Sequence, residues 1–240
     1  MAGVDGRRGG WALALASLDA RGRPAGVHWL TVRGQDAAGV AETLRLAAEA
    51  GAEAVGVDAP IGLPRDSWRS CDLLAKRRLG AASARVFLAP PREVLAAPTY
   101  GDARAVARAR LGGRSVSAQT YGLRRVVLAL DDALRHPPAE LADVASRVVE
   151  VHPELSFMAL AGRASRDPLP SKRTPIGATL RERAIASWLA DPAADLATPD
   201  GDDHLDALAA AWSASRWADG AAEVLGGEPD EHGIPMRIAV

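Results

Sequence analysis

Three apolar segments of strand length, each followed by a turn, occupy the start of the chain and limit the folds it can adopt. They are residues 1–5, 11–18 and 27–32, and turns rich in glycine and arginine separate them at 6–10 and 21–24. Strand-length apolar runs joined by such turns are typical of antiparallel strands that follow one another in a sheet. We therefore expect a three-stranded meander at the start of the fold.

A helix and a fourth strand are predicted next. Apolar side chains recur at helical spacing from Asp36 to Ala50, and Gly51 supplies a signal that ends a helix. Residues 54–58 form a short apolar segment that stops before Pro60. Because a helix between two strands of one sheet usually makes a crossover connection, we expect the fourth strand to lie parallel to the first.

The remainder of the chain is predicted to be mostly helical. We expect helices at roughly 67–79, 91–97, 102–111, 117–135, 155–161, 177–190 and 203–218, a strand at 148–151, and loops at 165–175 and 191–202. No internal repeat or long linker divides the sequence. The prediction is therefore a single α/β domain over 1–240 with a mixed sheet and a basic, mainly helical insertion at about 65–140.

Composition excludes several classes of protein. A single cysteine, Cys71, excludes an intrachain disulfide and a multi-cysteine zinc site, and we interpret it as a small buried hydrophobe in a protein of the reducing cytoplasm. Aromatic residues make up 4% of the chain, too few for a stacking platform that binds single strands. Apolar runs stay shorter than the roughly 20 residues of a membrane span, so no membrane partner is expected. The Arg7-Arg8 pair before residues 11–16 resembles a signal peptide, but we interpret this segment as a strand.

Charge is distributed unevenly along the sequence. Residues 65–125 carry a net charge of +9, and residues 126–240 carry −9, although the whole chain is at −1. A basic surface beside an acidic site would produce this pattern in a protein that binds polyanions. The same pattern would arise if the two segments formed ion pairs with each other, and the sequence leaves both readings open.

Acidic residues fall at positions that the predicted sheet would bring together. Asp5 ends the first strand, Asp58 ends the fourth, and Glu150 interrupts an apolar strand. Three more carboxylates, Asp202, Asp203 and Asp206, lie at the start of a predicted helix, where residues three and four apart share a face. Neighbouring carboxylates repel one another unless a cation compensates them, and oxygen ligands of this kind suit Mg²⁺.

Each acid also has an ordinary structural explanation. Asp5 and Asp58 precede a glycine turn and a proline turn, and an aspartate at 202 or 203 is a typical helix N-cap. Glu150 is the most informative, because a carboxylate inside an apolar strand is costly unless it is paired or bound to a metal.

Several motifs resemble the bacterial and archaeal domain-of-unknown-function family 429 (DUF429). They are Gly3-Val4-Asp5-Gly6, Gly9-Gly10-Trp11, residues 58–64 (DAPIGLP), residues 69–72 (RSCD), residues 86–92 (VFLAPPR), residues 150–157 (EVHPELSF), Ser171-Lys172 and residues 202–207 (DDHLDA). The resemblance extends over most of the chain and implies an RNase H-like fold and a predicted nuclease activity. Arg7 departs from the small residue or cysteine expected there.

The resemblance also implies a set of site residues. Asp5, Asp58, Glu150 and Asp203 or Asp206 would be the catalytic, metal-binding carboxylates, with Mg²⁺ or Mn²⁺ as the cofactor. By inference the basic segment and Lys172 would hold the phosphates of DNA or RNA. The predicted substrate residues are Arg69, Arg77, Arg78, Arg92 and Lys172, to which Lys76, Arg85 and Gln119 can be added.

Three further residues are auxiliary candidates: His152, Glu154 and Asp202. His152 and Glu154 follow the strand that carries Glu150, where they would tune a metal ligand or transfer a proton. The alternative for His152 is a hydrogen-bonded structural histidine.

The sequence therefore favours a metal-dependent nuclease or phosphodiesterase of the RNase H-like type. Two alternatives remain: an actin-like nucleotide-binding phosphotransferase and a non-catalytic module that binds nucleic acid or protein. A Walker lysine motif and a second glycine-rich phosphate loop, which would favour a nucleotide-binding protein, are missing from the sequence. The binding module remains open because a fold does not fix a function.

Overall fold

A five-stranded mixed sheet forms the centre of the structure, which is a computed structural model. The structure describes residues 1–196 and 201–240, and it describes Gly201 and Asp202 by their backbone alone. The strand order is β3-β2-β1-β4-β5. These strands are β1 (Ala2–Arg7), β2 (Gly10–Leu18), β3 (Pro24–Arg33), β4 (Val55–Asp58) and β5 (Val148–Glu150). Strand β2 runs antiparallel to both β1 and β3, whereas β4 lies parallel to β1 and β5 lies parallel to β4. The predicted meander and the parallel fourth strand are confirmed.

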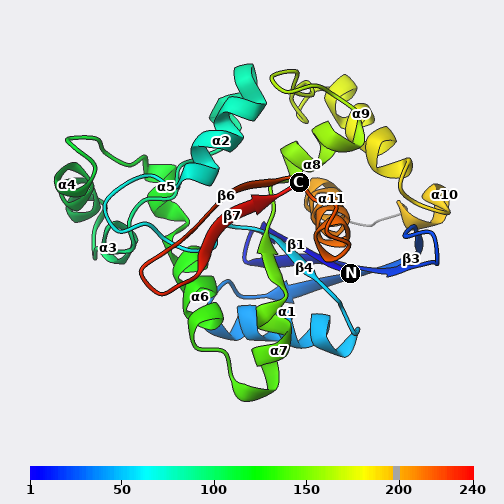
Figure 1. Cartoon of the computed structure of the whole chain (residues 1–240), viewed down its shortest axis with the longest axis horizontal. Helices are drawn as coiled ribbons and strands as arrows, with labels where there is room; N and C mark the ends of the chain where they lie inside the picture. The colour runs from blue at the N-terminus through cyan, green and yellow to red at the C-terminus, as the bar shows by residue number, and fades with distance from the viewer. Residues whose placement is uncertain (197–200) are drawn as a thin grey trace.

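Helices cover both faces of this sheet (Figure 1). The first face packs against α1 (Ala37–Glu49), α6 (Arg124–Arg135) and α7 (Ala142–Ser146) through a core that includes Leu44 and Leu130. The opposite face packs against α8 (Pro153–Leu160), α9 (Pro175–Ala186) and α11 (Gly201–Ala218). The expected α/β architecture is therefore present.

Helix α11 lies directly on the backbone of β1 and β4. A Cβ atom added at Gly3 would stand 1.9 Å from the carbonyl oxygen of Ala207, and one at Gly56 would stand 2.4 Å from that of Ala210. The helix presents a run of fully buried alanines, residues 207, 209, 210 and 211, at this contact. Two glycines on neighbouring strands and small side chains on the helix thus allow an unusually close approach, which fixes where α11 sits over the ends of β1 and β4.

Because of this contact, adding a single methyl group at Gly3 should lower the stability of the protein strongly. We expect Gly3→Ala to destabilise the protein by about 2–3 kcal/mol, because helix and strand must separate to admit the Cβ atom. Gly26→Ala on β3, where nothing lies within 4 Å of an added Cβ, is the control and should stay within about 0.5 kcal/mol. Urea unfolding of both variants measures the difference, and equal stabilities would contradict the close packing.

The segment between β4 and β5 is helical, as predicted. It contains α2 (Ser70–Leu79), the 3-10 turns η1 (Gly80–Arg85) and η2 (Ala139–Leu141), α3 (Arg92–Ala96), α4 (Tyr100–Arg110), α5 (Ala118–Gly122), α6 and α7. The single helix predicted over 117–135 is wrong in one respect. Two helices, α5 and α6, divide this span at Leu123, which ends the first and precedes the second.

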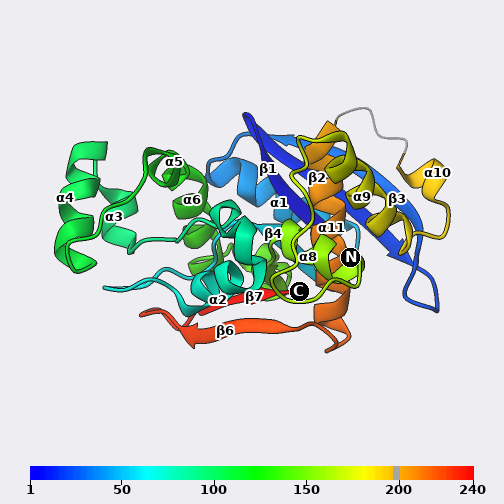
Figure 2. The same cartoon turned by 90° about the horizontal axis from the view of Figure 1, so that it is seen from above.

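The end of the chain holds two elements that we did not predict. A short helix, α10 (Pro192–Asp195), lies inside the expected loop, where the Asp191 side chain caps its N-terminus. A hairpin of β6 (Val224–Pro229) and β7 (Pro235–Ala239) follows α11 and packs against α2 (Figure 2). Cys71 is completely buried beneath this hairpin, so its interpretation as a small buried hydrophobe is confirmed. Within the described part of the chain, no helix has both the length and the apolar character that crossing a membrane requires.

Candidate active site

A cleft of about 530 Å³ lies where β1 and β4 end. Its lining contains three chemical groups from different parts of the chain. The acids include Asp5, Asp58 and Asp206, the cations include Arg85, Lys172 and Arg173, and the apolar side chains include Phe87, Leu123 and Val126. The carboxyl ends of parallel strands are where α/β proteins usually bind ligands, so this cleft is the candidate site.

Asp5 and Asp58 lie side by side on neighbouring parallel strands. They are register partners in the β1–β4 ladder, which puts their side chains on the same face, and a hydrogen bond joins the two carboxyl groups. Burial raises the pKa of Asp58 to about 7, although the hydrogen bond from Asp5 and the charge of Lys172 oppose that rise. Burial and the charge of Asp58 raise the pKa of Asp5 well above its usual range. This pair therefore concentrates negative charge at the strand ends.

Helix α11 brings two of the predicted acids toward this pair. Asp206 is buried, and its Oδ2 atom accepts a 2.5 Å hydrogen bond from the Nζ atom of Lys172. Burial raises the pKa of Asp206 to about 6, against the opposing charge of Lys172. Asp203 is more exposed, with Oδ2 4.0 Å from Nε of Arg7, and its charge contributes to the raised pKa of Asp5. The side chain of Asp202 lies outside the described residues.

Glu150 lines the same cleft as Asp5 and Asp58, but its carboxylate is paired with protein groups. Its Oε2 atom accepts hydrogen bonds from the backbone N–H of Ile61 at 2.7 Å and from Nη1 of Arg69 at 2.6 Å, and its Oε1 atom accepts from Nη2 of Arg69 at 2.7 Å. Arg69 is also paired with Asp72, and all three side chains are buried. Both oxygens of Glu150 are thus engaged by protein groups, and Arg69, which also lines the cleft, belongs to a buried ion-pair network.

The other predicted phosphate-binding arginines, unlike Arg69, do not line the cleft. Arg78 pairs with Glu223, and Arg92 pairs with Asp131 and Asp230. Neither these arginines nor the exposed Arg77 lines the cleft. The basic middle segment and the acidic second half therefore form ion pairs with each other, which was one of the two readings of the charge pattern.

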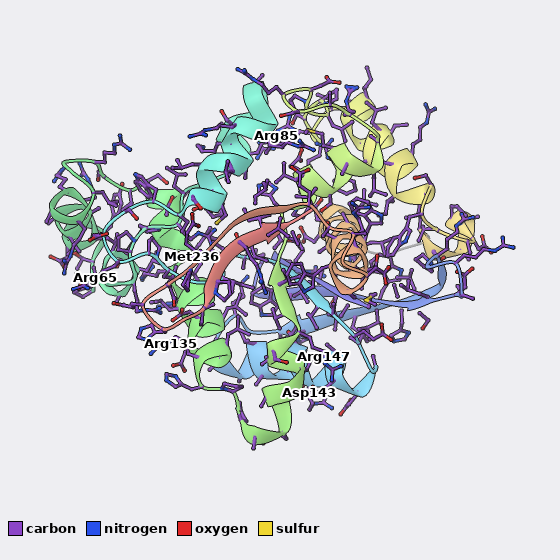
Figure 3. All side chains as sticks on the ribbon, viewed as in Figure 1. Arg65, Arg85, Arg135, Asp143, Arg147 and Met236 are labelled. Atoms are coloured by element: carbon purple, nitrogen blue, oxygen red, sulfur yellow. The ribbon has the colours of Figure 1, made fainter. Side chains whose placement is uncertain are left out.

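Lys76 likewise has a structural role, because its Nζ atom donates to the backbone carbonyls of Ser83 and Val86. By contrast, Lys172, Arg85 and Gln119 do line the cleft. Arg85 extends between α2 and the segment of α8 and α9 (Figure 3). Sequence reasoning missed Arg173 and Gln35, which also line the cleft. No sequence motif distinguished Arg173 and Gln35 from surface residues, whereas Lys172 belongs to the Ser171-Lys172 motif.

His152 and Glu154 border the cleft just after β5. The His152 ring forms a hydrogen bond with the backbone of Arg85, burial lowers its pKa, and its buried Nδ1 atom has no hydrogen-bond partner among the described residues. Glu154 Oε2 accepts hydrogen bonds of 2.6 Å from both Arg85 and Arg181. Burial thus favours the neutral form of the His152 imidazole, whose Nδ1 atom is unused among the described residues, and Glu154 holds Arg85 at the cleft.

The donor set at the strand ends fits a hard divalent cation. The carboxylates of Asp5, Asp58 and Asp206 offer oxygen ligands, and burial raises the pKa of each, so that a bound cation would favour their ionised forms. Among the described residues, however, no three His, Cys, Asp or Glu side chains are already grouped closely enough to hold a metal ion. The Lys172 ammonium supplies the positive charge beside Asp206 in this arrangement.

Lys172 should consequently control the pH at which a cation binds. We expect Lys172→Met to move the midpoint of Mn²⁺ binding upward by about one pH unit, because its charge lowers the pKa of all three aspartates. Calorimetric titrations with Mn²⁺ between pH 5 and 9 measure this midpoint. Arg183→Met, at an exposed position of α9, is the control. An unchanged midpoint in Lys172→Met would show that Lys172 does not act on these acids.

Comparison with known proteins identifies the family. A family model described as a protein of unknown function (DUF429) matches residues 3–231. Searches of curated proteins and of solved structures return no match. The matched region contains both strand-end aspartates, Lys172 and Asp206. The chain therefore belongs to the DUF429 family.

Proposed function

We propose that this protein is a metal-dependent nuclease that hydrolyses phosphodiester bonds of DNA or RNA, with Mg²⁺ or Mn²⁺ as cofactor. The observation that carries the proposal is the in-register pair Asp5 and Asp58 at the ends of β1 and β4, with Asp206 brought to the same cleft by α11. Such a cluster is costly in a folded protein unless it serves to bind a cation.

The topology supports an RNase H-like assignment of the fold. An antiparallel meander, a helix, two further strands parallel to the first and a late helix that carries an acid occur here in that order. This is the arrangement that the sequence resemblance implies. The fold alone does not establish an activity, so the proposal depends on the chemistry of the site.

The residues of the cleft have roles that suit phosphodiester hydrolysis. Asp5, Asp58 and Asp206 would hold the cation, which polarises the phosphoryl group and activates water. Lys172, Arg85 and Arg173 compensate the charge of the phosphate. In the hydrolysis, the water oxygen bonds to phosphorus, the P–O bond to the neighbouring nucleotide breaks, and the leaving oxygen takes up a proton.

His152 is suited to the proton that the attacking water loses. Its neutral imidazole has a free lone pair on Nδ1, since the ring hydrogen bond to Arg85 uses the other nitrogen. Because Nδ1 is buried, His152 would act as a general base only if the ring or its cover moves when the substrate binds.

A cleavage assay tests the proposal. Labelled single-stranded, duplex and hybrid nucleic acids are incubated with Mg²⁺, Mn²⁺ or EDTA, together with Asp5→Asn and the matched surface control Asp66→Asn. We expect metal-dependent cleavage that Asp5→Asn reduces by more than about 100-fold, since even groups that only orient metal ligands contribute about 10–100-fold. The exposed Asp66 should be replaceable without loss.

The other outcomes are equally informative. Cleavage that persists in folded Asp5→Asn would contradict this site and indicate a contaminating nuclease. Mn²⁺ binding that depends on Asp5, without cleavage of any nucleic acid, would favour a different phosphate substrate, such as that of a phosphotransferase. If neither binding nor cleavage occurs, the non-catalytic module is the better description.

A further inference from the structure

We infer that the cleft receives one nucleotide at a time, so that the substrate is the free end of a single strand rather than a continuous duplex. This inference rests on the proposed nuclease function and specifies its substrate. It depends on the size of the cleft, on the segments that enclose it and on the distribution of apolar and charged groups in its lining.

The cleft has the dimensions of a small-molecule site. Its volume of about 530 Å³ lies within the range of roughly 300–1,000 Å³ that is usual for pockets that enclose one small ligand. Two layers of structure border it. Helices α5 and α6 lie on one side of the strands, and α8, α9 and α11 lie on the other, in both views (Figures 1 and 2). The acids therefore lie in a half-open cleft of limited volume, with residues of α5 and α6 and of α8 and α11 in its lining.

The inserted segment contributes the apolar part of the lining. Phe87 and Leu123 are half-buried, and Val126 is 9% exposed. All three line the same cleft as the aspartates. A bare phosphate or a metal ion gains nothing from contact with an apolar surface, whereas the face of a nucleobase packs well on apolar and aromatic side chains.

The number of aromatic rings in the lining limits how many bases can stack. Phe87 is the one Phe, Tyr or Trp among the described residues that line the cleft. Proteins that hold a run of single-stranded nucleotides use successive aromatic side chains, one for each stacked base. Phe87 therefore suits a single base, while Arg85, Lys172 and Arg173 give the same lining positive charge, which would attract its phosphate.

The first test compares a linear and a covalently closed circular single strand of the same sequence, both with Mn²⁺. We expect the linear strand to be degraded to mononucleotides at least 10-fold faster than the circle is opened. Equal rates on the two substrates would overturn the inference and leave the nuclease function intact, because internal cleavage requires a strand to pass through the site.

The second test measures binding without catalysis. The probe is deoxyadenosine monophosphate with Mn²⁺, titrated into the wild type, Leu123→Trp and the exposed control Arg125→Trp. We expect Leu123→Trp to weaken nucleotide binding at least 10-fold while Mn²⁺ binding stays unchanged, and Arg125→Trp to bind both normally. Nucleotide binding of this kind without any cleavage would support the pocket and contradict the nuclease. Nucleotide binding that is undetectable, or unaffected by Leu123→Trp, would overturn the inference.

Discussion

Replacing Arg69 by methionine is expected to destabilise the protein by about 3–5 kcal/mol and to lower Tm by roughly 6–20 °C. Arg69 is 1% exposed and donates to Glu150 and Asp72, which are themselves buried. Removing its charge leaves two carboxylates buried beside each other without a cation. Such an uncompensated charge costs much more than the intact pair contributes.

Arg77→Met is the matched control, because Arg77 lies on the same part of the chain and is exposed on α2. Its stability should change by less than about 0.5 kcal/mol. Thermal and urea unfolding of both variants measure the effect. A fully stable Arg69→Met protein would contradict the structural role and return Arg69 to the set of candidate substrate residues.

Asp58→Asn is expected to raise stability at pH 8 by about 2 kcal/mol in the absence of metal. Burial raises the pKa of Asp58 from 3.8 in the unfolded chain to about 7. The folded protein thus binds this proton more tightly, so stability is highest below pH 4 and decreases as the pH rises from about 4 to 7. Each pKa unit corresponds to about 1.4 kcal/mol, and contact with water in the cleft reduces the full penalty. Asparagine removes this penalty and keeps a polar group beside Asp5.

The measurement is urea unfolding of the wild type and Asp58→Asn at pH 4 and pH 8 with EDTA present. The gain should appear at pH 8 and vanish at pH 4, where Asp58 is protonated in the wild type. Mn²⁺ should stabilise the wild type and have little effect on the variant, because ligand binding to the native state adds to stability. The exposed Asp219→Asn is the control. A variant that is less stable than the wild type at pH 8 would contradict a burial penalty on the ionised Asp58.

The strand-end acids could be predicted because their positions follow from local patterns. Asp5 and Asp58 each end an apolar segment, and a crossover connection then makes their strands neighbours. The position of Asp206 could be predicted because it lies near the start of a segment whose apolar residues recur at helical spacing. In each case the sequence near the residue contains the information, so the prediction needs one assumption about topology and none about side-chain packing.

Glu150 shows where such reasoning ends. A carboxylate inside an apolar strand predicts a buried partner, but local sequence does not distinguish a metal ion from an arginine. The partner is Arg69, which lies 81 residues earlier. The β6–β7 hairpin and the apolar lining of the cleft were missed for a related reason. Both depend on contacts between segments that lie far apart in the sequence. Such contacts produce no clear hydrophobic periodicity in either segment.

The backbone contact between β1 and α11 also has a consequence for biosynthesis. The ribosome makes Asp5 well before the helix that covers Gly3 and carries Asp206, because β1 and α11 lie far apart in the sequence. Until then the alanine-rich surface is missing, and one face of the nascent sheet has no cover. A cation site that needs all three aspartates cannot exist on a partly made chain. The proposed activity would accordingly appear only after α11 has left the exit tunnel and packed on β1.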